Sequence, residues 1–165
     1  ALLELGGNNA IIVTEHANLD IAVRSALFGA VGTAGQRCTT TRRLIVHEKV
    51  YATVKENLIK AYAQLRIGNP LDPENHVGPL IDEAAVKQYK QALKRVKEEG
   101  GNLLVPGGVL AGKGYESGCY VKPAIAEVEN HFEIVQHETF APILYLIKYS
   151  MLDEAITYQN GVKQG

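Results

Sequence analysis

The spacing of apolar and polar positions along the chain predicts helices and strands in alternation. Short apolar runs at 1–5 and 10–13, separated by Gly-Gly-Asn-Asn, are expected to form strand, turn and strand. Apolar residues at helical spacing predict helices, which fall in 18–35, 48–68, 82–101 and 151–160. β-rich runs predict further strands at 42–47, 102–108, 118–128 and both ends of 133–149.

This order of elements predicts an α/β fold, in three layers, with a mainly parallel sheet. Asn18 and Asp82 are the residue types that cap helix N-termini, so we expect helices to begin directly after them. The stretch 69–82 contains three prolines and is expected to be loop. No G-x-G-x-x-G phosphate-binding fingerprint is present in the sequence.

Composition narrows the classes of partner. A net charge of −1 gives no electrostatic reason to expect binding to nucleic acid or to an anionic membrane. No apolar run approaches the roughly 20 residues that span a bilayer. The two cysteines and the five histidines lack the spacing of a disulfide framework or a metal site, so neither is expected. A reducing compartment is favoured, with the cytoplasm preferred and the mitochondrion left open.

Cys38 lies in GTAGQRCTTTRR, a small and polar segment between an apolar helix and a strand. A thiolate is favoured beside a cation, and Arg37 is the preceding residue, so Cys38 is a candidate nucleophile. The alternative is a free cysteine that happens to lie in a loop. Cys119 is the contrast, because it has no neighbouring charge and is expected to be a packing residue.

Two carboxylates are candidates for the same site. Glu4 lies in an apolar run, and burial there would favour its neutral form and suit a general base. The alternative is an exposed position on an edge strand. Glu138, in HETFAPIL, could accept hydrogen bonds from two ribose hydroxyls or could be a turn residue.

Taken in order, LELGGNN, GQRCT and ETFAP resemble the aldehyde dehydrogenase superfamily, with Glu4 preceding Cys38 by 34 residues. The stretches GTAGQRCTTTRRLIVHE and HETFAPILY are similar in sequence to members of its antiquitin branch, the α-aminoadipic semialdehyde dehydrogenases. The resemblance covers essentially the whole chain. It implies an enzyme that uses NAD, with NADP not excluded, to oxidise a small aldehyde, and a tetramer in the full-length protein.

The resemblance also implies roles for individual residues. Cys38 would be the nucleophile, forming a thiohemiacetal and then a thioester, and Glu4 would activate the water that hydrolyses the thioester. The cofactor would contact Leu5, Gly6, Glu138 and Phe140. Arg37 and Thr39 would border the substrate, and Arg37 could orient the charged end of an amino-acid semialdehyde or serve only an internal ion pair.

The resemblance implies the domain organisation as well. Residues 1–9 would be a strand and turn at the edge of the cofactor-binding domain, 10–150 the catalytic domain, and 151–165 the start of a C-terminal element. Because the chain begins without Met and ends at NGVKQG, we expect a fragment that is inactive by itself. Two alternatives remain: a CoA-acylating semialdehyde dehydrogenase, which Glu4 disfavours, and a non-catalytic structural protein on the same fold.

Overall fold

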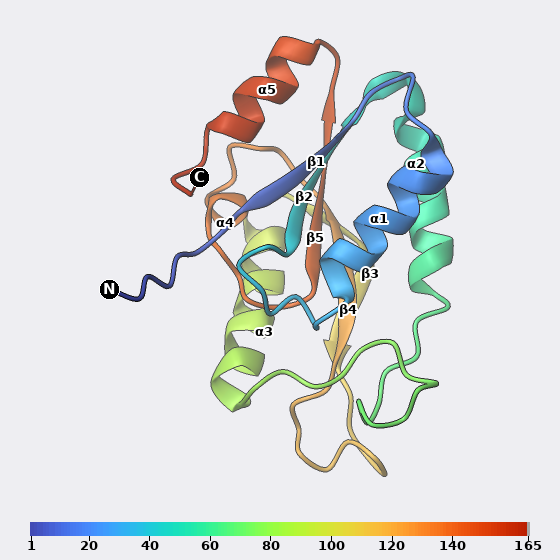
Figure 1. Cartoon of the computed structure of the whole chain (residues 1–165), viewed down its shortest axis with the longest axis vertical. Helices are drawn as coiled ribbons and strands as arrows, with labels where there is room; N and C mark the ends of the chain where they lie inside the picture. The colour runs from blue at the N-terminus through green and yellow to red at the C-terminus, as the bar shows by residue number, and fades with distance from the viewer. Residues whose placement is uncertain (165) are drawn as a thin grey trace.

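A computed structural model describes residues 1–164 and confirms the α/β fold with a mainly parallel sheet (Figure 1). The sheet has five strands among these residues, in the spatial order β1-β2-β5-β4-β3. The first four are mutually parallel, and β3 pairs with β4 antiparallel at the edge. The strands are β1 (Asn9–Val13), β2 (Thr41–His47), β3 (Asn102–Val109), β4 (Val121–Glu127) and β5 (Ile143–Tyr149).

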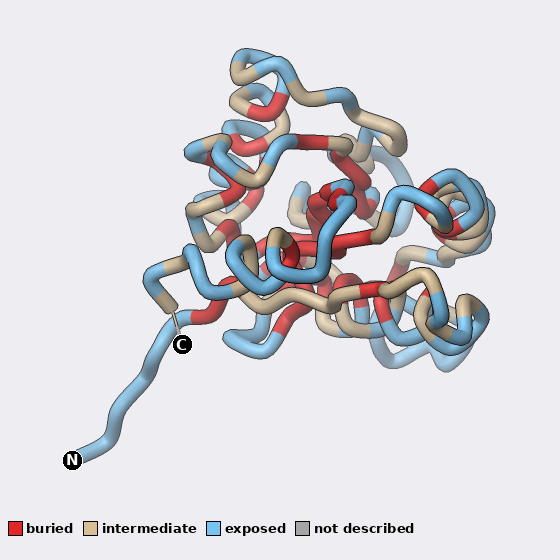
Figure 2. The backbone as a smooth tube through the Cα atoms, turned by 90° about the horizontal axis from the view of Figure 1, so that it is seen from above, coloured by how far each residue is buried: buried red, intermediate tan, exposed pale blue. Residues whose placement is uncertain are grey.

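Helices cover both faces of this sheet, which gives the expected three layers. In Figure 1, α1 and α2 lie on one side, and α3 and α5 lie on the other. The bounds are α1 (Leu19–Val31), α2 (Glu48–Tyr62), α3 (Glu83–Glu98), α4 (Glu133–Gln136) and α5 (Leu152–Asn160). The central strands β2 and β5 are therefore buried on both faces, as the red interior of Figure 2 shows.

The helix starts expected from the sequence are confirmed. The Asn18 side chain accepts a hydrogen bond from the Ile21 N–H at 3.2 Å, and the Asp82 side chain accepts one from the Ala85 N–H at 2.8 Å. The end of α2 differs, because it ends at Tyr62 and not near Gly68. The N–H groups of Gln64 and Leu65 donate to carbonyls three residues back, which tightens the chain and stops the α-helix.

Two expected strands are wrong. Residues 1–8 run without strand or turn, so the strand expected at 1–5 and the turn before β1 are both absent. No described strand lies beside residues 1–5 to supply hydrogen bonds, and this segment projects from the body, with Leu2, Leu3 and Leu5 exposed (Figures 1 and 2).

The second wrong strand, at 133–136, is the single helical turn α4. Ile134 and Val135 are buried there, and the Glu99 carboxylate accepts a hydrogen bond from the Ile134 N–H at 3.1 Å. Two adjacent apolar residues between polar ones fit either type of element, and this acceptor, 35 positions away in the sequence, satisfies the helical turn.

Candidate active site

Cys38 lies in a tight turn between α1 and β2. The Thr40 N–H donates to the Arg37 carbonyl at 3.1 Å, and the Arg37 N–H donates to Thr40 Oγ1 at 3.1 Å. Gly35, just before the turn, has φ +70°, and a Cβ there would lie 2.2 Å from the Ala141 carbonyl oxygen. Only glycine suits both the conformation and the contact, so the loop is held against the segment leading into β5.

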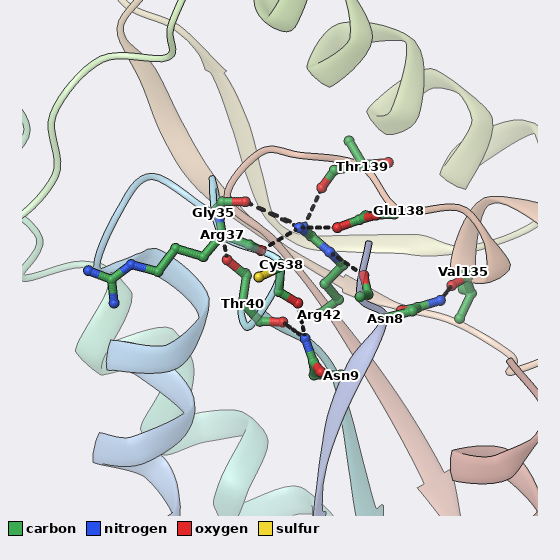
Figure 3. Close-up of polar contacts among 11 residues, drawn as sticks. Asn8, Asn9, Gly35, Arg37, Cys38, Thr40, Arg42, Val135, Glu138 and Thr139 are labelled. Carbon is green, nitrogen blue, oxygen red and sulfur yellow. Dashed lines mark hydrogen bonds and ion pairs between the residues drawn. The ribbon is translucent and has the colours of Figure 1, made fainter. Parts of the chain in front are cut away.

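The segment before β1 lies directly against this turn. A Cβ on Gly7 would lie 1.9 Å from the Cys38 carbonyl oxygen. The Asn9 side-chain amide donates to the carbonyls of Cys38 at 2.6 Å and Thr40 at 3.1 Å (Figure 3). These contacts fix the main chain of the Cys38 turn while the Cys38 residue itself is exposed to solvent.

Glu138 approaches from the loop between α4 and β5. Its side chain is 19% exposed, and Oε1 lies 3.5 Å from Nη2 of Arg42. A Cβ on Gly6 would lie 2.2 Å from Glu138 Oε2, so the backbone at Gly6 closely approaches the carboxylate. The Glu138 side chain therefore faces the segment that carries Glu4.

These three segments line an open pocket of about 440 Å³. All eight predicted site residues line it, together with Gln36; they are Glu4, Leu5, Gly6, Arg37, Cys38, Thr39, Glu138 and Phe140. A larger groove of about 780 Å³ lies between α1 and α2, but it contains none of the eight. The smaller pocket is the candidate active site because the chemically competent groups meet there.

Two expectations about individual side chains do not fit. Glu4 is exposed, so the expected burial of its carboxylate is wrong for this structure. Figure 3 shows the Arg37 side chain extending away from the Cys38 sulfur. Among residues 1–164, Arg37 forms no ion pair, so an internal salt bridge does not account for it either.

Sequence reasoning missed two buried cations next to the pocket. Arg42 and Arg43, at the start of β2, are 1% and 0% exposed. Burial lowers the pKa of the Arg42 guanidinium, an effect that Glu138 partly opposes, and burial lowers the pKa of Arg43 to about 10. Two arginines opening an apolar strand were the available signal, because buried cations require partners.

Other candidate groups remain outside the pocket. Cys119 packs partly buried against the core, as expected. None of the five histidines lines the pocket. Across residues 1–164, no cluster of His, Cys, Asp and Glu is arranged to hold a metal ion, and no helix has the length and apolar character to cross a bilayer.

The sequence model of the Aldehyde dehydrogenase family matches residues 1–165, the whole chain. The chain belongs to the aldehyde dehydrogenase family. It is 49% identical over 164 residues to "Aldehyde dehydrogenase family 7 member A1" of Pisum sativum, covering 99% of this chain and 32% of the relative. It is 50% identical over 166 residues to "Alpha-aminoadipic semialdehyde dehydrogenase" of Bos taurus, covering 100% of this chain and 30% of the relative.

Solved aldehyde dehydrogenases share the fold. The betaine aldehyde dehydrogenase of Staphylococcus aureus, solved in complex with NAD+, superposes with a TM-score of 0.92 at 27% identity, over 96% of this chain and 32% of that one. The chain thus spans about a third of the length of the aldehyde dehydrogenases it matches. The expected resemblance to the family and to its antiquitin branch is confirmed.

Proposed function

We propose that this chain supplies the nucleophile and part of the cofactor site of an NAD-dependent aldehyde dehydrogenase. The observation that carries the proposal is that Cys38, Glu4 and Glu138 come from three separate segments and line one pocket. A thiol can attack an aldehyde and a carboxylate can activate the water that hydrolyses the resulting thioester, while the second, partly buried carboxylate can bind a cofactor.

Cys38 is the nucleophile in this proposal. Its thiolate forms a carbon–sulfur bond to the aldehyde carbon and gives a thiohemiacetal. Loss of hydride from that carbon leaves a thioester on Cys38. Exposure of Cys38 to the pocket supports the role, because the sulfur is accessible to a substrate. A backbone N–H in the turn can stabilise the oxygen that becomes negatively charged on attack.

Glu4 is the base for the second half of the reaction. It removes a proton from water, which attacks the thioester carbon, and the carbon–sulfur bond breaks to release a carboxylate and free Cys38. Glu4 lines the same pocket as Cys38, which supports the role.

NAD, when bound, accepts the hydride. The residues present fit one end of such a cofactor. Glu138 is only 19% exposed and lines the pocket, where its carboxylate can accept hydrogen bonds from a ribose. Gly6 leaves space beside that carboxylate, since a Cβ would collide with Oε2. Phe140 is 40% exposed at the pocket wall, where its ring can pack against a flat heterocycle.

We further propose an amino-acid semialdehyde, such as α-aminoadipic semialdehyde, as substrate. The support is the similarity to the Bos taurus protein of that name and the position of Arg37 on the pocket wall. Because the Arg37 side chain extends away from the Cys38 sulfur, its cation can meet the far, charged end of a substrate whose aldehyde is at Cys38.

The central test is Cys38→Ala in the native full-length protein. We expect loss of aldehyde oxidation and loss of iodoacetamide labelling at the peptide that contains residue 38. Cys119→Ala is the matched control, because this second cysteine lies outside the pocket and should leave activity unchanged. Oxidation that survives Cys38→Ala would refute the nucleophile. Wild-type turnover that requires added CoA would identify the acylating alternative.

A further inference from the structure

One buried side chain contacts all three segments that form the pocket. Arg42 Nε donates to the Gly7 carbonyl at 3.2 Å, on the segment that carries Glu4. Its Nη groups donate to the Gly35 carbonyl at 3.4 and 3.5 Å and to the Arg37 carbonyl at 3.1 Å, on the segment that carries Cys38 (Figure 3).

The third segment is held by the same guanidinium in three ways. Arg42 Nη1 donates to the Thr139 carbonyl, and Nη2 lies 3.5 Å from Glu138 Oε1. The Arg42 guanidinium carbon also lies 5.4 Å from the centre of the Phe140 ring, within reach of a cation–π interaction. Three consecutive residues at the proposed cofactor side of the pocket therefore contact one cation.

Arginine is the side chain suited to this position. Its planar guanidinium offers five N–H donors in a fixed arrangement, and the Arg42 contacts radiate from it to carbonyls on different segments. Lysine offers three donors at one nitrogen and could not reach the same carbonyls together. Since Arg42 is 1% exposed, water does not compete for these donors.

The ion pair also distinguishes the two oxygens of Glu138. Oε1 lies beside Arg42 and is buried, without a hydrogen bond from any described residue. Oε2 lies beside Gly6, which lines the pocket. The contact with Arg42 therefore determines how the carboxylate is presented to a ligand.

We propose that Arg42 is the positioning residue of this site, fixing the relative placement of Glu4, Cys38 and Glu138 through main-chain contacts. It touches neither substrate nor reacting atoms in this role. The inference rests on the proposed function, because the spacing that Arg42 maintains is that of a nucleophile, a base and a cofactor carboxylate.

Arg43 provides a matched control inside the same strand. It is equally buried, but its guanidinium donates to the carbonyls of Asn8 at 2.7 and 3.1 Å and Tyr158 at 2.6 Å, and to Gln159. These contacts tie β2 to the residue before β1 and to the C-terminal end of α5. Loss of Arg43 therefore removes an equally buried arginine that shares with Arg42 only the Glu4 segment, so the Arg42 contacts to the Cys38 and Glu138 segments remain in place.

The experiment compares Arg42→Lys, Arg42→Gln and Arg43→Lys in the native full-length protein by hydrogen–deuterium exchange and steady-state kinetics. Both Arg42 variants should speed amide exchange about tenfold or more at Thr40 and Ala141, whose N–H groups are hydrogen-bonded within the released segments.

We expect kcat/KM to fall about 10²-fold, the cost of misplacing groups by about 1 Å. Arg42→Lys retains a charge beside Glu138, so kcat should fall while KM for NAD changes little, whereas Arg42→Gln should also raise KM for NAD.

Arg43→Lys should lower the melting temperature and leave exchange at Thr40 and Ala141 near wild type, and kcat/KM should fall far less than in the Arg42 variants. Equal kinetic losses in Arg42→Lys and Arg43→Lys, or unchanged exchange at both amides in the Arg42 variants, would overturn the proposal. Arg42→Gln leaves no charge to bury, so it provides a second folded variant if Arg42→Lys does not fold. A wild-type protein that oxidises no aldehyde would refute the proposed function, while the exchange measurement would still decide the role of Arg42.

Discussion

At the scale of residues, neighbouring glycines of the LELGG segment have different reasons to be glycine. A Cβ on Gly7 would meet a backbone carbonyl, that of Cys38, whereas a Cβ on Gly6 would meet the end of the flexible Glu138 side chain. The first neighbour cannot move without displacing the Cys38 turn. The second can rotate away, so the two positions should respond differently to the same substitution.

Gly7→Ala should therefore destabilise the native full-length protein by about 1–3 kcal/mol, the usual cost of overpacking, and should also lower activity. Gly6→Ala should leave stability near wild type and raise the Kd for NAD by displacing Glu138. Denaturant unfolding and NAD titration by fluorescence measure the two effects. Comparable destabilisation by both substitutions would contradict the contacts described for these glycines.

A second residue-scale prediction concerns Glu4. Glu4→Gln keeps the size of the side chain but removes its ability to accept a proton, so hydrolysis of the thioester should slow more than hydride transfer. A stopped-flow experiment should show an NADH burst followed by slow turnover, with the steady rate reduced about 10²–10⁴-fold, the usual contribution of a general base. If turnover is unchanged, Glu4 is not the base.

The sequence predicted which residues form the candidate site, but not all of the contacts that hold them in place. Cys38, Glu4 and Glu138 were found by residue type and order, and the structure brings them to one pocket. The cation expected to matter was Arg37, the chain neighbour of Cys38, yet its side chain extends away from the sulfur. Arg42, on β2, lies next to the site because of the way this strand packs against the other segments. That placement depends on tertiary structure, which residue order does not show.

At the scale of elements, a polar contact joins α2 to β4. Glu127 accepts hydrogen bonds from the Tyr51 hydroxyl at 2.8 Å and from Lys55 at 2.9 Å. Burial by itself raises the pKa of the Glu127 carboxyl, but the bonds from Lys55 and Tyr51 outweigh it, and the pKa lies below its ordinary value of 4.5. The same contact raises the pKa of Tyr51, after burial as the larger cause.

The direction of this shift predicts a pH dependence. The unfolded chain takes up a proton at Glu127 at higher pH than the folded chain does, so this stabilisation is complete above pH 4.5 and is lost as the pH falls below it. Thermal melts should show wild type more stable than Glu127→Gln at pH 7, with the difference narrowing below pH 4.5.

Glu56→Gln is the control, because its partner Lys60 lies on the same exposed helix face and such pairs contribute little. A constant difference in melting temperature between wild type and Glu127→Gln across this pH range would refute the assignment.

Elements with strong periodicity and caps were predicted well, whereas two of the short apolar runs, 1–5 and 133–136, were not. Asn18 and Asp82 mark helix starts by local chemistry that the sequence contains. Residues 1–5 and 133–136 depend on neighbours far along the chain: the first has no described strand beside it, and the second is completed by Glu99. Apolar character alone does not distinguish these outcomes.

At the scale of the whole molecule, the projecting N-terminal segment leaves large apolar side chains in water. Leu2, Leu3 and Leu5 are 88%, 75% and 73% exposed, with only Glu4 between them. Exposed apolar surface of this kind marks a site of contact with another protein surface. Since the chain spans about a third of the length of its relatives, we propose that protein outside the described residues covers this segment in the full-length protein.

The 165-residue chain expressed by itself should therefore self-associate. Replacing Leu2, Leu3 and Leu5 together with Ser should shift it towards monomer, as measured by light scattering over a range of concentrations. Leu71→Ser is the control, because Leu71 is 89% exposed but lies in a separate loop. Association that is unaffected by the triple substitution would place the contact surface elsewhere.

The contacts of Arg42 have a consequence for how such an enzyme can diversify. Four of its partners, at residues 7, 35, 37 and 139, are bound through carbonyl oxygens that every amino acid possesses. Side chains at positions such as Arg37 and Thr39 can therefore change without removing the acceptors that Arg42 uses. A lineage, or a protein engineer, can alter the substrate-facing wall while the arrangement of nucleophile, base and cofactor carboxylate is inherited intact.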